Sequence, residues 1–172
     1  MATYTLISSQ VLSSSAASVT FSSIPQTYKD LVVRVSVRDD DTSANTALAK
    51  LSTNSSSANI SITRLYTDGS TVTSSRLGGQ SVMYSPGADS SLATANTFGS
   101  IEWYIPQYAG STTKPISVFG AAETNAATFS SGSQALGTYA GFLNSTTAIT
   151  SVTIAANGPN WVTNSSFYLY GI

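Results

Sequence analysis

The chain has 172 residues, of which 41% are hydrophobic and 9% are charged, with a net charge of −1. It contains no cysteine and no histidine, which excludes disulfides, thiolate metal sites and catalysis by either side chain. The seven basic residues form no run, which argues against nucleic-acid binding. The length predicts one domain over residues 1–172, with a hydrophobic core of its own.

Serine and threonine make up about a third of the chain, far above average usage. A surface of neutral hydroxyl groups can pack against copies of itself without desolvating many charges, which favours assembly. No run approaches the ~18 apolar residues of a membrane span, so we expect no membrane partner. Residues 1–11 lack a basic leader and a long apolar stretch, so we expect synthesis and folding in the cytoplasm.

Hydrophobic residues alternate with a period of two from the start of the chain, as they do in β-strands. The first predicted strands cover residues 4–7 and 18–21. The clearest strand covers residues 30–38, where four aliphatic residues from Leu31 to Val37 fall on one face. We expect that face to lie in the core and the opposite face to be mostly solvated.

An acidic cluster, Asp39, Asp40 and Asp41, follows this strand. Carboxylates and backbone carbonyls in a loop could hold Ca²⁺. The spacing differs from that of an EF-hand, however, and we favour a solvated turn in which Arg34 or Arg38 partly neutralises the acids. No metal site is assigned here.

The middle of the chain carries weaker signals. Residues 44–51 could form one or two helical turns, although they lack a sustained stripe with a period of 3.6 residues. The segments 52–58, 86–95 and 125–134 are rich in alanine and serine. We predict that all three are loops, either exposed or in contact with a partner.

A β-hairpin is predicted in the middle of the chain. Residues 59–67 form its first strand and residues 71–75 its return strand. Asp68 and Gly69 lie between them and favour a two-residue type I′ turn, which needs a positive φ at both central residues.

The remaining predicted strands continue at short intervals to the end of the chain. They cover residues 97–105, 116–122, 139–143, 149–155 and 167–171. Roughly eight to ten short strands separated by polar loops predict an all-β fold, a jelly-roll-like antiparallel β-sandwich.

A short motif occurs twice. Ile24-Pro25-Gln26 and Ile105-Pro106-Gln107 are each followed by a tyrosine, at Tyr28 and Tyr108. Because proline removes a backbone donor and favours extended geometry before it, each motif predicts a bend with the tyrosine folded back on the sandwich. A structural corner is the favoured interpretation, and a paired binding element is the alternative.

Few residues could support catalysis. Glu102 and Glu123 are the only glutamates, and a glycosidase would need such a pair about 5–10 Å apart across a cleft. The favoured interpretation is that both are solvent-facing residues near a lysine or arginine. The chain lacks a G-x-S-x-G nucleophile elbow and a Gly-rich phosphate loop with its lysine. We therefore predict a non-enzymatic protein and assign no catalytic, cofactor-binding or metal-binding residues.

Aromatic residues make up 10% of the chain, including nine tyrosines and two tryptophans. Such side chains can fill a core, anchor a protein interface or stack on sugar rings. Trp161 follows Gly158-Pro159-Asn160, so it could be exposed or could close one end of the sandwich. A place in the core or at a subunit interface is the favoured prediction, and sugar binding is the alternative.

The two ends of the chain carry a resemblance to a known class of protein. Thr5-Leu6-Ile7-Ser8-Ser9, residues 18–31, residues 149–152 and the terminal Phe167-Tyr168-Leu169-Tyr170-Gly171-Ile172 resemble small virion structural proteins of tailed bacteriophages. Residues 39–95 depart from that pattern. The resemblance implies a jelly roll on a phage particle, commonly a trimer, of the capsid decoration or the fibre type.

From this resemblance we expect a capsid decoration (cement) protein on the outer capsid surface of the virion, made in the host cytoplasm. It would form homotrimers and bind the major capsid protein, stabilising contacts between capsid subunits through buried neutral surface. The alternative is a tail or head fibre, or a receptor-binding domain that recognises carbohydrate.

Overall fold

The computed structural model describes residues 3–55, 57, 59–125, 129 and 133–172. The described residues contain no helix, and so none long and apolar enough to cross a membrane. Twelve strands are formed: β1 (Thr5–Val11), β2 (Ser18–Phe21), β3 (Asp30–Val37), β4 (Thr46–Thr53), β5 (Ile60–Thr67), β6 (Val72–Gln80), β7 (Met83–Asp89), β8 (Gly99–Pro106), β9 (Lys114–Ala121), β10 (Leu136–Leu143), β11 (Val152–Ala156) and β12 (Ser166–Gly171).

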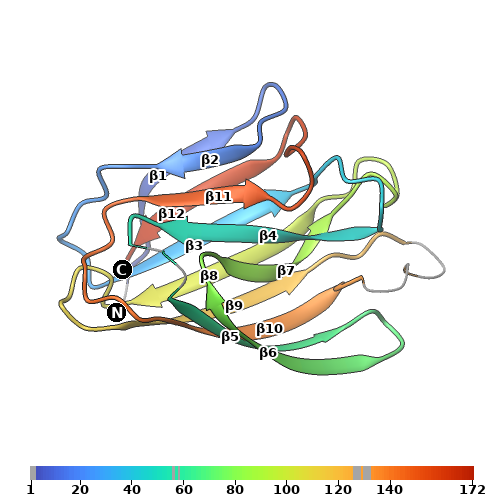
Figure 1. Cartoon of the computed structure of the whole chain (residues 1–172). Helices are drawn as coiled ribbons and strands as arrows, with labels where there is room; N and C mark the ends of the chain where they lie inside the picture. Colours follow the sequence, from blue (N-terminus) through green and yellow to red (C-terminus); the bar gives the residue numbers. More distant parts are fainter. Residues whose placement is uncertain (1–2, 56, 58, 126–128, 130–132) are drawn as a thin grey trace.

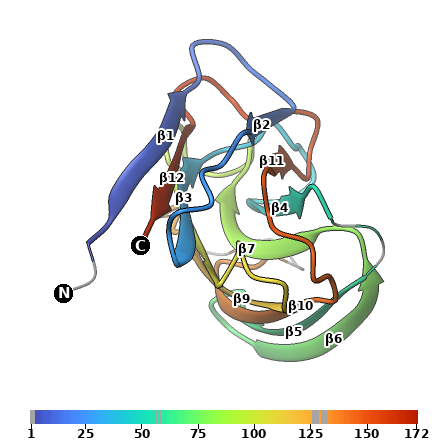
Figure 2. The same cartoon turned by 90° about the vertical axis from the view of Figure 1, so that its left-hand side faces the viewer.

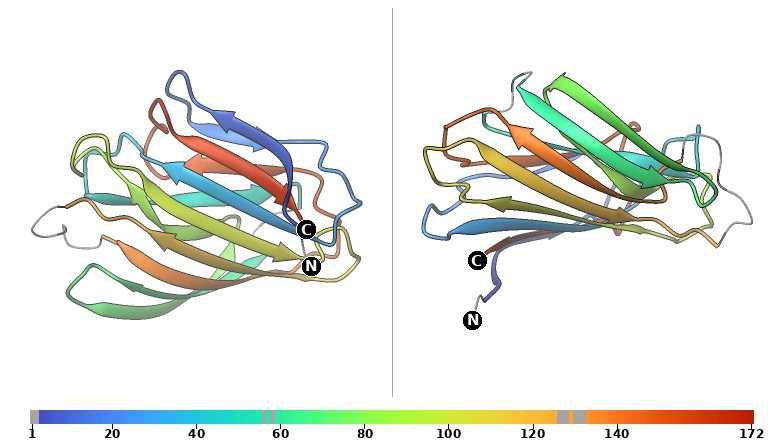
Figure 3. Two further views of the ribbon diagram at one scale, coloured as in Figure 1. Left: turned by 180° about the vertical axis from the view of Figure 1, so that it is seen from behind. Right: turned by 90° about the horizontal axis from the view of Figure 1, so that it is seen from below.

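The strands form two antiparallel sheets packed face to face (Figure 1). One sheet has eight strands in the order β1-β12-β3-β8-β9-β10-β5-β6, and the other has four in the order β2-β11-β4-β7. Figure 3 shows the large sheet from behind. The fold is thus an all-β antiparallel sandwich of the jelly-roll-like class, as the sequence predicts.

The core lies between the sheets and follows from alternation along the strands. In β3 the side chains of Leu31, Val33 and Val37 are fully buried, whereas Arg34 and Ser36 are exposed on the outer face. Both tryptophans, Trp103 of β8 and Trp161, are also fully buried. Burial of such side chains provides most of the driving force for folding.

The predicted helical turns at residues 44–51 are wrong, because this segment lies in and just before strand β4. Here Ala47, Ala49 and Leu51 point into the core with a period of two. Neighbouring strands on both sides supply the hydrogen bonds: Leu51 pairs with Met83 of β7 and with Ile154 of β11. Two neighbouring strands thus override the helical propensity of alanine. Residues 52 and 53, predicted to lie in a loop, also belong to β4.

The loop predicted at residues 86–95 begins later than expected, because β7 continues to Asp89. The backbone of β7 crosses directly over glycines of the large sheet. A methyl group at Gly99 would overlap the carbonyl oxygen of Gly87, and one at Gly120 would overlap the carbonyl oxygen of Pro86. Close backbone approach of this kind requires glycine. Residues 56, 58, 126–128 and 130–132 of the other two predicted loops lie outside the described residues.

The hairpin between β5 and β6 forms, but its turn is not type I′. Gly69 has a φ of 89°, whereas Asp68 is not among the residues with positive φ. The Asp68 amide donates to the Thr71 carbonyl at 3.4 Å, which centres the turn one residue later than predicted. The Asp68 carboxylate accepts hydrogen bonds from the amides of Ser70 and Thr71 at 3.0 and 2.8 Å, as short polar side chains do in turns.

The two Ile-Pro-Gln motifs form adjoining corners, which confirms the favoured prediction. The Tyr108 side chain is fully buried, and its hydroxyl donates to the carbonyl of Pro25 in the other motif. The Gln26 amide group donates to the carbonyl of Ile149 at 3.0 Å. The Tyr28 ring lies against Gly171, where a Cβ would clash with it.

The eight-stranded sheet is strongly curled, as twisted sheets are. Seen along the strands in Figure 2, β1, β12 and β3 form one limb, and β9, β10, β5 and β6 form another at a steep angle to it. The outer face of the sheet therefore presents two surfaces that point in different directions.

Candidate functional site

The two glutamates considered as a catalytic pair each have a partner of their own. Glu102 lies on β8 opposite Arg34 of β3, and the Arg34 Nε to Glu102 Oε2 distance is 2.7 Å. Glu123 follows the end of β9, and its carboxylate accepts a hydrogen bond from the Asn125 amide at 2.9 Å. Glu102 is paired across the sheet with Phe119. Glu123 lies beyond the last residue of β9, Ala121, in a segment that is not paired with β8.

The acidic cluster is a structural junction rather than a wholly solvated turn. Asp39 is fully buried, and its two carboxylate oxygens accept the amides of Asp41 and Gly158, both at 3.1 Å. Asp40 accepts the amide and the side-chain nitrogen of Asn160 at 2.8 and 3.0 Å. Burial raises the pKa of Asp39 to about 6. Backbone and side-chain N–H groups thus occupy these oxygens, and the described residues contain no group of acids suited to a metal ion.

A second buried carboxylate, Asp89, lies next to this junction. Its backbone carbonyl accepts the Asp39 amide at 2.8 Å. The side chain is fully buried, and neither carboxylate oxygen has a hydrogen-bond partner among the described residues. Burial raises its pKa. Nearby, the Arg38 guanidinium donates to the carbonyls of Ala93 and Thr94 at 3.0 and 2.8 Å. The alternation of apolar residues gives no signal for this burial.

Lys114, at the start of β9, is also fully buried. Its Nζ donates to the carbonyls of Gly110, Thr112 and Ser145 at 2.9, 2.7 and 3.3 Å. Burial lowers its pKa. These contacts satisfy the three donors of the ammonium group and tie two loops at one end of the sandwich together.

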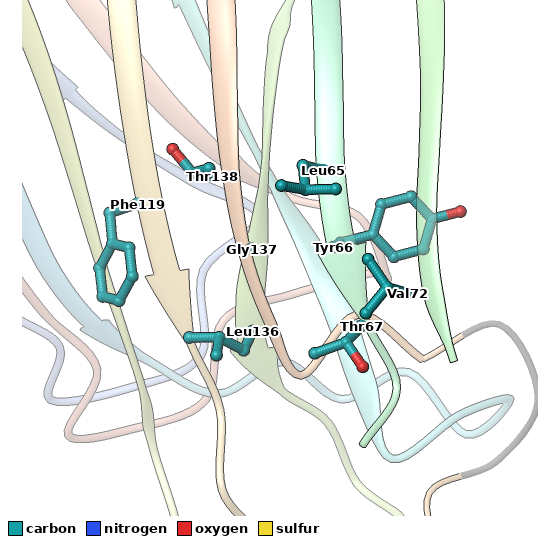
Figure 4. A pocket seen from close by; sticks show the side chains of 8 residues that line it. All are labelled: Leu65, Tyr66, Thr67, Val72, Phe119, Leu136, Gly137 and Thr138. Carbon is teal, nitrogen blue, oxygen red and sulfur yellow. The ribbon is translucent and has the colours of Figure 1, made fainter. Parts of the chain in front are cut away.

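The clearest exposed feature is an apolar patch on the outer face of the large sheet. It consists of Leu65 of β5, Val72 of β6, Phe119 of β9 and Leu136 of β10. Their exposed fractions lie between 45% and 70%. With Thr67 and Thr138 they line an open hollow of about 270 Å³, shown in Figure 4. We call these four residues the apolar patch.

Cross-strand pairing assembles the apolar patch from distant parts of the chain. Thr138 of β10 lies opposite Leu65 on one side and opposite Phe119 on the other. A second open hollow continues along the same face, with Thr63, Ser117 and Ala140 among its lining residues. The patch is therefore bordered by hydroxyl groups.

The sequence contains one signal for the apolar patch. In β5, β9 and β10 large apolar residues occur on both faces of the strand, whereas an ordinary solvated face is polar. Contiguous exposed apolar groups on a soluble domain are typical of an interaction surface.

The aromatic residues are divided between the core and the surface. Trp161 packs against Phe167 with ring centroids 6.0 Å apart, and its indole Nε1 donates to the Ile154 carbonyl at 3.2 Å. This confirms the core placement of Trp161. Because Trp103 and Trp161 are fully buried, neither indole is available to stack on a sugar.

Comparison with protein-family models, with curated proteins and with solved structures finds no match to this chain. Its function must therefore be argued from its own surface. The feature best suited to binding a partner is the apolar patch on β5, β6, β9 and β10, which an antiparallel sandwich leaves uncovered on its outer side.

Proposed function

We propose that this chain is a non-enzymatic structural protein of a tailed-phage virion, a capsid decoration (cement) protein that docks on the outer shell through the apolar patch. The observation that carries the proposal is the cluster of half-exposed Leu65, Val72, Phe119 and Leu136 on an open, hydroxyl-bordered sheet face. An interface with an apolar centre and a polar rim is the usual anatomy of protein association.

The energetics suit a contact repeated over a symmetric shell. Burying the exposed half of each patch side chain contributes about 1 kcal/mol per residue, which is weak for a single copy. A homotrimer, which we also propose, would present three patches at once and gain from effective concentration. The partner surface on the major capsid protein would be flat and apolar, because the patch is shallow and offers no charge.

Cryo-electron microscopy of purified particles that carry this chain tests the proposal directly. Regular density at three-fold or quasi-three-fold positions of the shell, with β5, β6, β9 and β10 facing the capsid, is the expected result. Density only at the tail or at one vertex would overturn the decoration role and favour the fibre or receptor-binding alternative. Sedimentation of the recombinant chain at three times 17.8 kDa is expected for the trimer.

A further inference from the structure

A second surface lies on another part of the outer face of the large sheet, and tyrosines dominate it. It is formed by outward-facing side chains of β12, β3 and β8, together with one residue that precedes β1. We call it the tyrosine surface; its members are Tyr4, Arg34, Glu102, Tyr104, Tyr168 and Tyr170.

Strand register brings these residues together. Tyr168 of β12 pairs with Arg34 of β3, which pairs with Glu102 of β8. In the neighbouring row of the same face, two residues along each strand, Tyr170 pairs with Val32, which pairs with Tyr104. Two adjacent rows of one sheet face thus carry three tyrosines around an ion pair.

The rings form an ordered cluster. Tyr168 and Tyr170 are stacked, with centroids 6.4 Å apart and planes inclined by 22°. Tyr4 meets Tyr170 edge to face at 6.1 Å and 81°. The Arg34 guanidinium carbon lies 4.8 Å from the Tyr4 centroid and 5.9 Å from the Tyr170 centroid. These are the distances of aromatic pairs and cation–π contacts, so the cluster is held in place before any ligand arrives.

The polar groups at its centre retain unused hydrogen-bonding capacity. The Arg34 and Glu102 side chains are 48% and 39% exposed. Among the described residues, the guanidinium forms its hydrogen bond through Nε only, to Glu102. The two terminal NH₂ groups of Arg34 and the second carboxylate oxygen of Glu102 therefore remain open to a ligand.

We propose that the tyrosine surface binds carbohydrate, as a chain of neutral sugar units laid across β12, β3 and β8. A pyranose ring has an apolar C–H face that packs on an aromatic ring, and its rim of hydroxyls both donates and accepts hydrogen bonds. The tyrosine rings can pack against the C–H face of the sugar. The guanidinium of Arg34 can donate hydrogen bonds to the sugar hydroxyls, and the carboxylate of Glu102 can accept hydrogen bonds from them.

Charge and shape favour a neutral polymer over other ligands. The charge of Arg34 is balanced by Glu102 at 2.7 Å, and the Asp30 carboxylate accepts the Tyr104 hydroxyl at 2.7 Å, so the surface has no excess positive charge to attract a polyanion. The cluster lies on an open sheet face, which suits an extended chain rather than a small enclosed molecule.

This site is separate from the proposed docking surface. The apolar patch lies on the limb formed by β9, β10, β5 and β6, which is turned away from the limb with β1, β12 and β3 (Figure 2). A decoration protein seated by the patch would thus leave the tyrosine surface exposed. The carbohydrate proposal does not depend on where the protein is located, because the isolated chain carries the whole surface.

The test is binding of the recombinant chain to a printed array of bacterial capsular and O-antigen polysaccharides, followed by affinity electrophoresis in gels containing the best neutral polymer. We expect retardation of the wild-type chain. Tyr168→Ala and Arg34→Gln should each weaken binding at least tenfold. Val72→Ser, on the apolar patch, should bind like the wild type.

Circular dichroism of each variant controls for folding, and Tyr168→Phe adds a variant that keeps the ring. Retained binding by Tyr168→Phe with loss in Tyr168→Ala would identify the ring face as the contact. An array without signal, or equal binding by the wild type and Tyr168→Ala, would overturn the proposal. Binding to acidic polysaccharides alone would also overturn it, because the proposed ligand is neutral.

Discussion

Buried charged side chains shape this protein at the scale of single residues. In a chain with few charges, Asp39, Asp89 and Lys114 are fully buried. Removing an ion from water is costly, so a buried group either gains hydrogen bonds that replace hydration or has its pKa shifted toward the neutral form. Lys114 and Asp39 gain hydrogen bonds from backbone partners. The Asp89 carboxylate has no hydrogen-bond partner among the described residues, and burial raises its pKa, which favours the neutral acid.

Replacing Lys114 should test how much its three carbonyl contacts stabilise the fold. Lys114→Met removes every donor and leaves the three carbonyls that Lys114 contacts without this partner, so we expect a loss of about 2–4 kcal/mol in unfolding free energy. Urea unfolding followed by fluorescence measures this change in unfolding free energy. Lys29→Met is the matched control, because Lys29 is exposed and should change stability by less than about 0.5 kcal/mol. Equal effects would contradict the structural role of Lys114.

The pH dependence of stability should carry the signature of Asp39. Because burial raises the pKa of Asp39 from 3.8 to about 6 in the folded state, the folded chain holds a proton that the unfolded chain releases between these values. The stabilisation is full below the unfolded pKa and is lost as the pH rises through 6. Going from pH 8 to pH 5, Asp39 should add about 1.4 kcal/mol.

Urea titrations at pH 5 and pH 8 check this expectation. Burial raises the pKa of Asp89 in the same direction. Hydrogen bonds from Ser43 lower the pKa of Asp41, so the contribution of Asp41 is lost only at lower pH and stays constant between pH 8 and pH 5. Asp39→Asn should therefore reduce the gain at pH 5. If Asp39→Asn left the pH dependence of stability unchanged, Asp39 would not have the raised pKa on which this prediction rests.

At the scale of elements, β7 shows how glycine permits two sheets to close on one another. Pro86 and Gly87 rest directly on the backbone at Gly99 and Gly120 of the large sheet. A strand can approach another backbone this closely only where no Cβ intervenes. These glycines therefore position β7, and with it the end of the four-stranded sheet.

Substituting one of these glycines should be far more damaging than substituting an open one. Gly99→Ala places a methyl group on the carbonyl oxygen of Gly87, so we expect a loss of about 3 kcal/mol or more, through overpacking and displacement of β7. Gly78→Ala, in β6, is the control because nothing lies within 4 Å of its added Cβ. Thermal unfolding measures the stability of both variants. A Gly99→Ala protein as stable as Gly78→Ala would contradict the close packing of β7 on Gly99.

At the scale of the whole molecule, the curled eight-stranded sheet separates two surfaces of different chemistry. One limb exposes the apolar patch and the other exposes the tyrosine surface. A flat sheet would place both on one plane, where a partner bound to one would cover the other. Curvature thus allows one of these surfaces to stay uncovered when a partner binds the other.

Shell docking should depend on the apolar patch and not on exposed apolar residues in general. We expect Val72→Ser and Phe119→Ser to weaken rebinding to particles depleted of this protein by about tenfold each, since each removes about 1–2 kcal/mol of buried apolar contact. Cosedimentation measures the bound fraction. Val11→Ser is the matched control, because Val11 is 58% exposed on β1, outside the patch. Equal losses in Val11→Ser and Val72→Ser would argue against docking by the patch.

Local patterns in the sequence predict much of this architecture. Ten of the twelve strands lie where alternation places them, and the repeated Ile-Pro-Gln motifs form the predicted corners. Strands β4 and β7 escape prediction because alanine, glycine and proline give little alternation. Their extended form depends on neighbouring strands and on contact with the large sheet.

The sequence by itself determined the class of fold and the chemistry that is excluded, because side-chain alternation and the absence of cysteine and histidine are local or compositional properties. Only the tertiary structure decided which strands are neighbours. It brought Arg34 beside Glu102 and Tyr168, placed Leu65 near Phe119, and buried Asp39. The physical reason is that strand pairing joins residues far apart in the chain, and nothing in the local alternation of a strand specifies its partner.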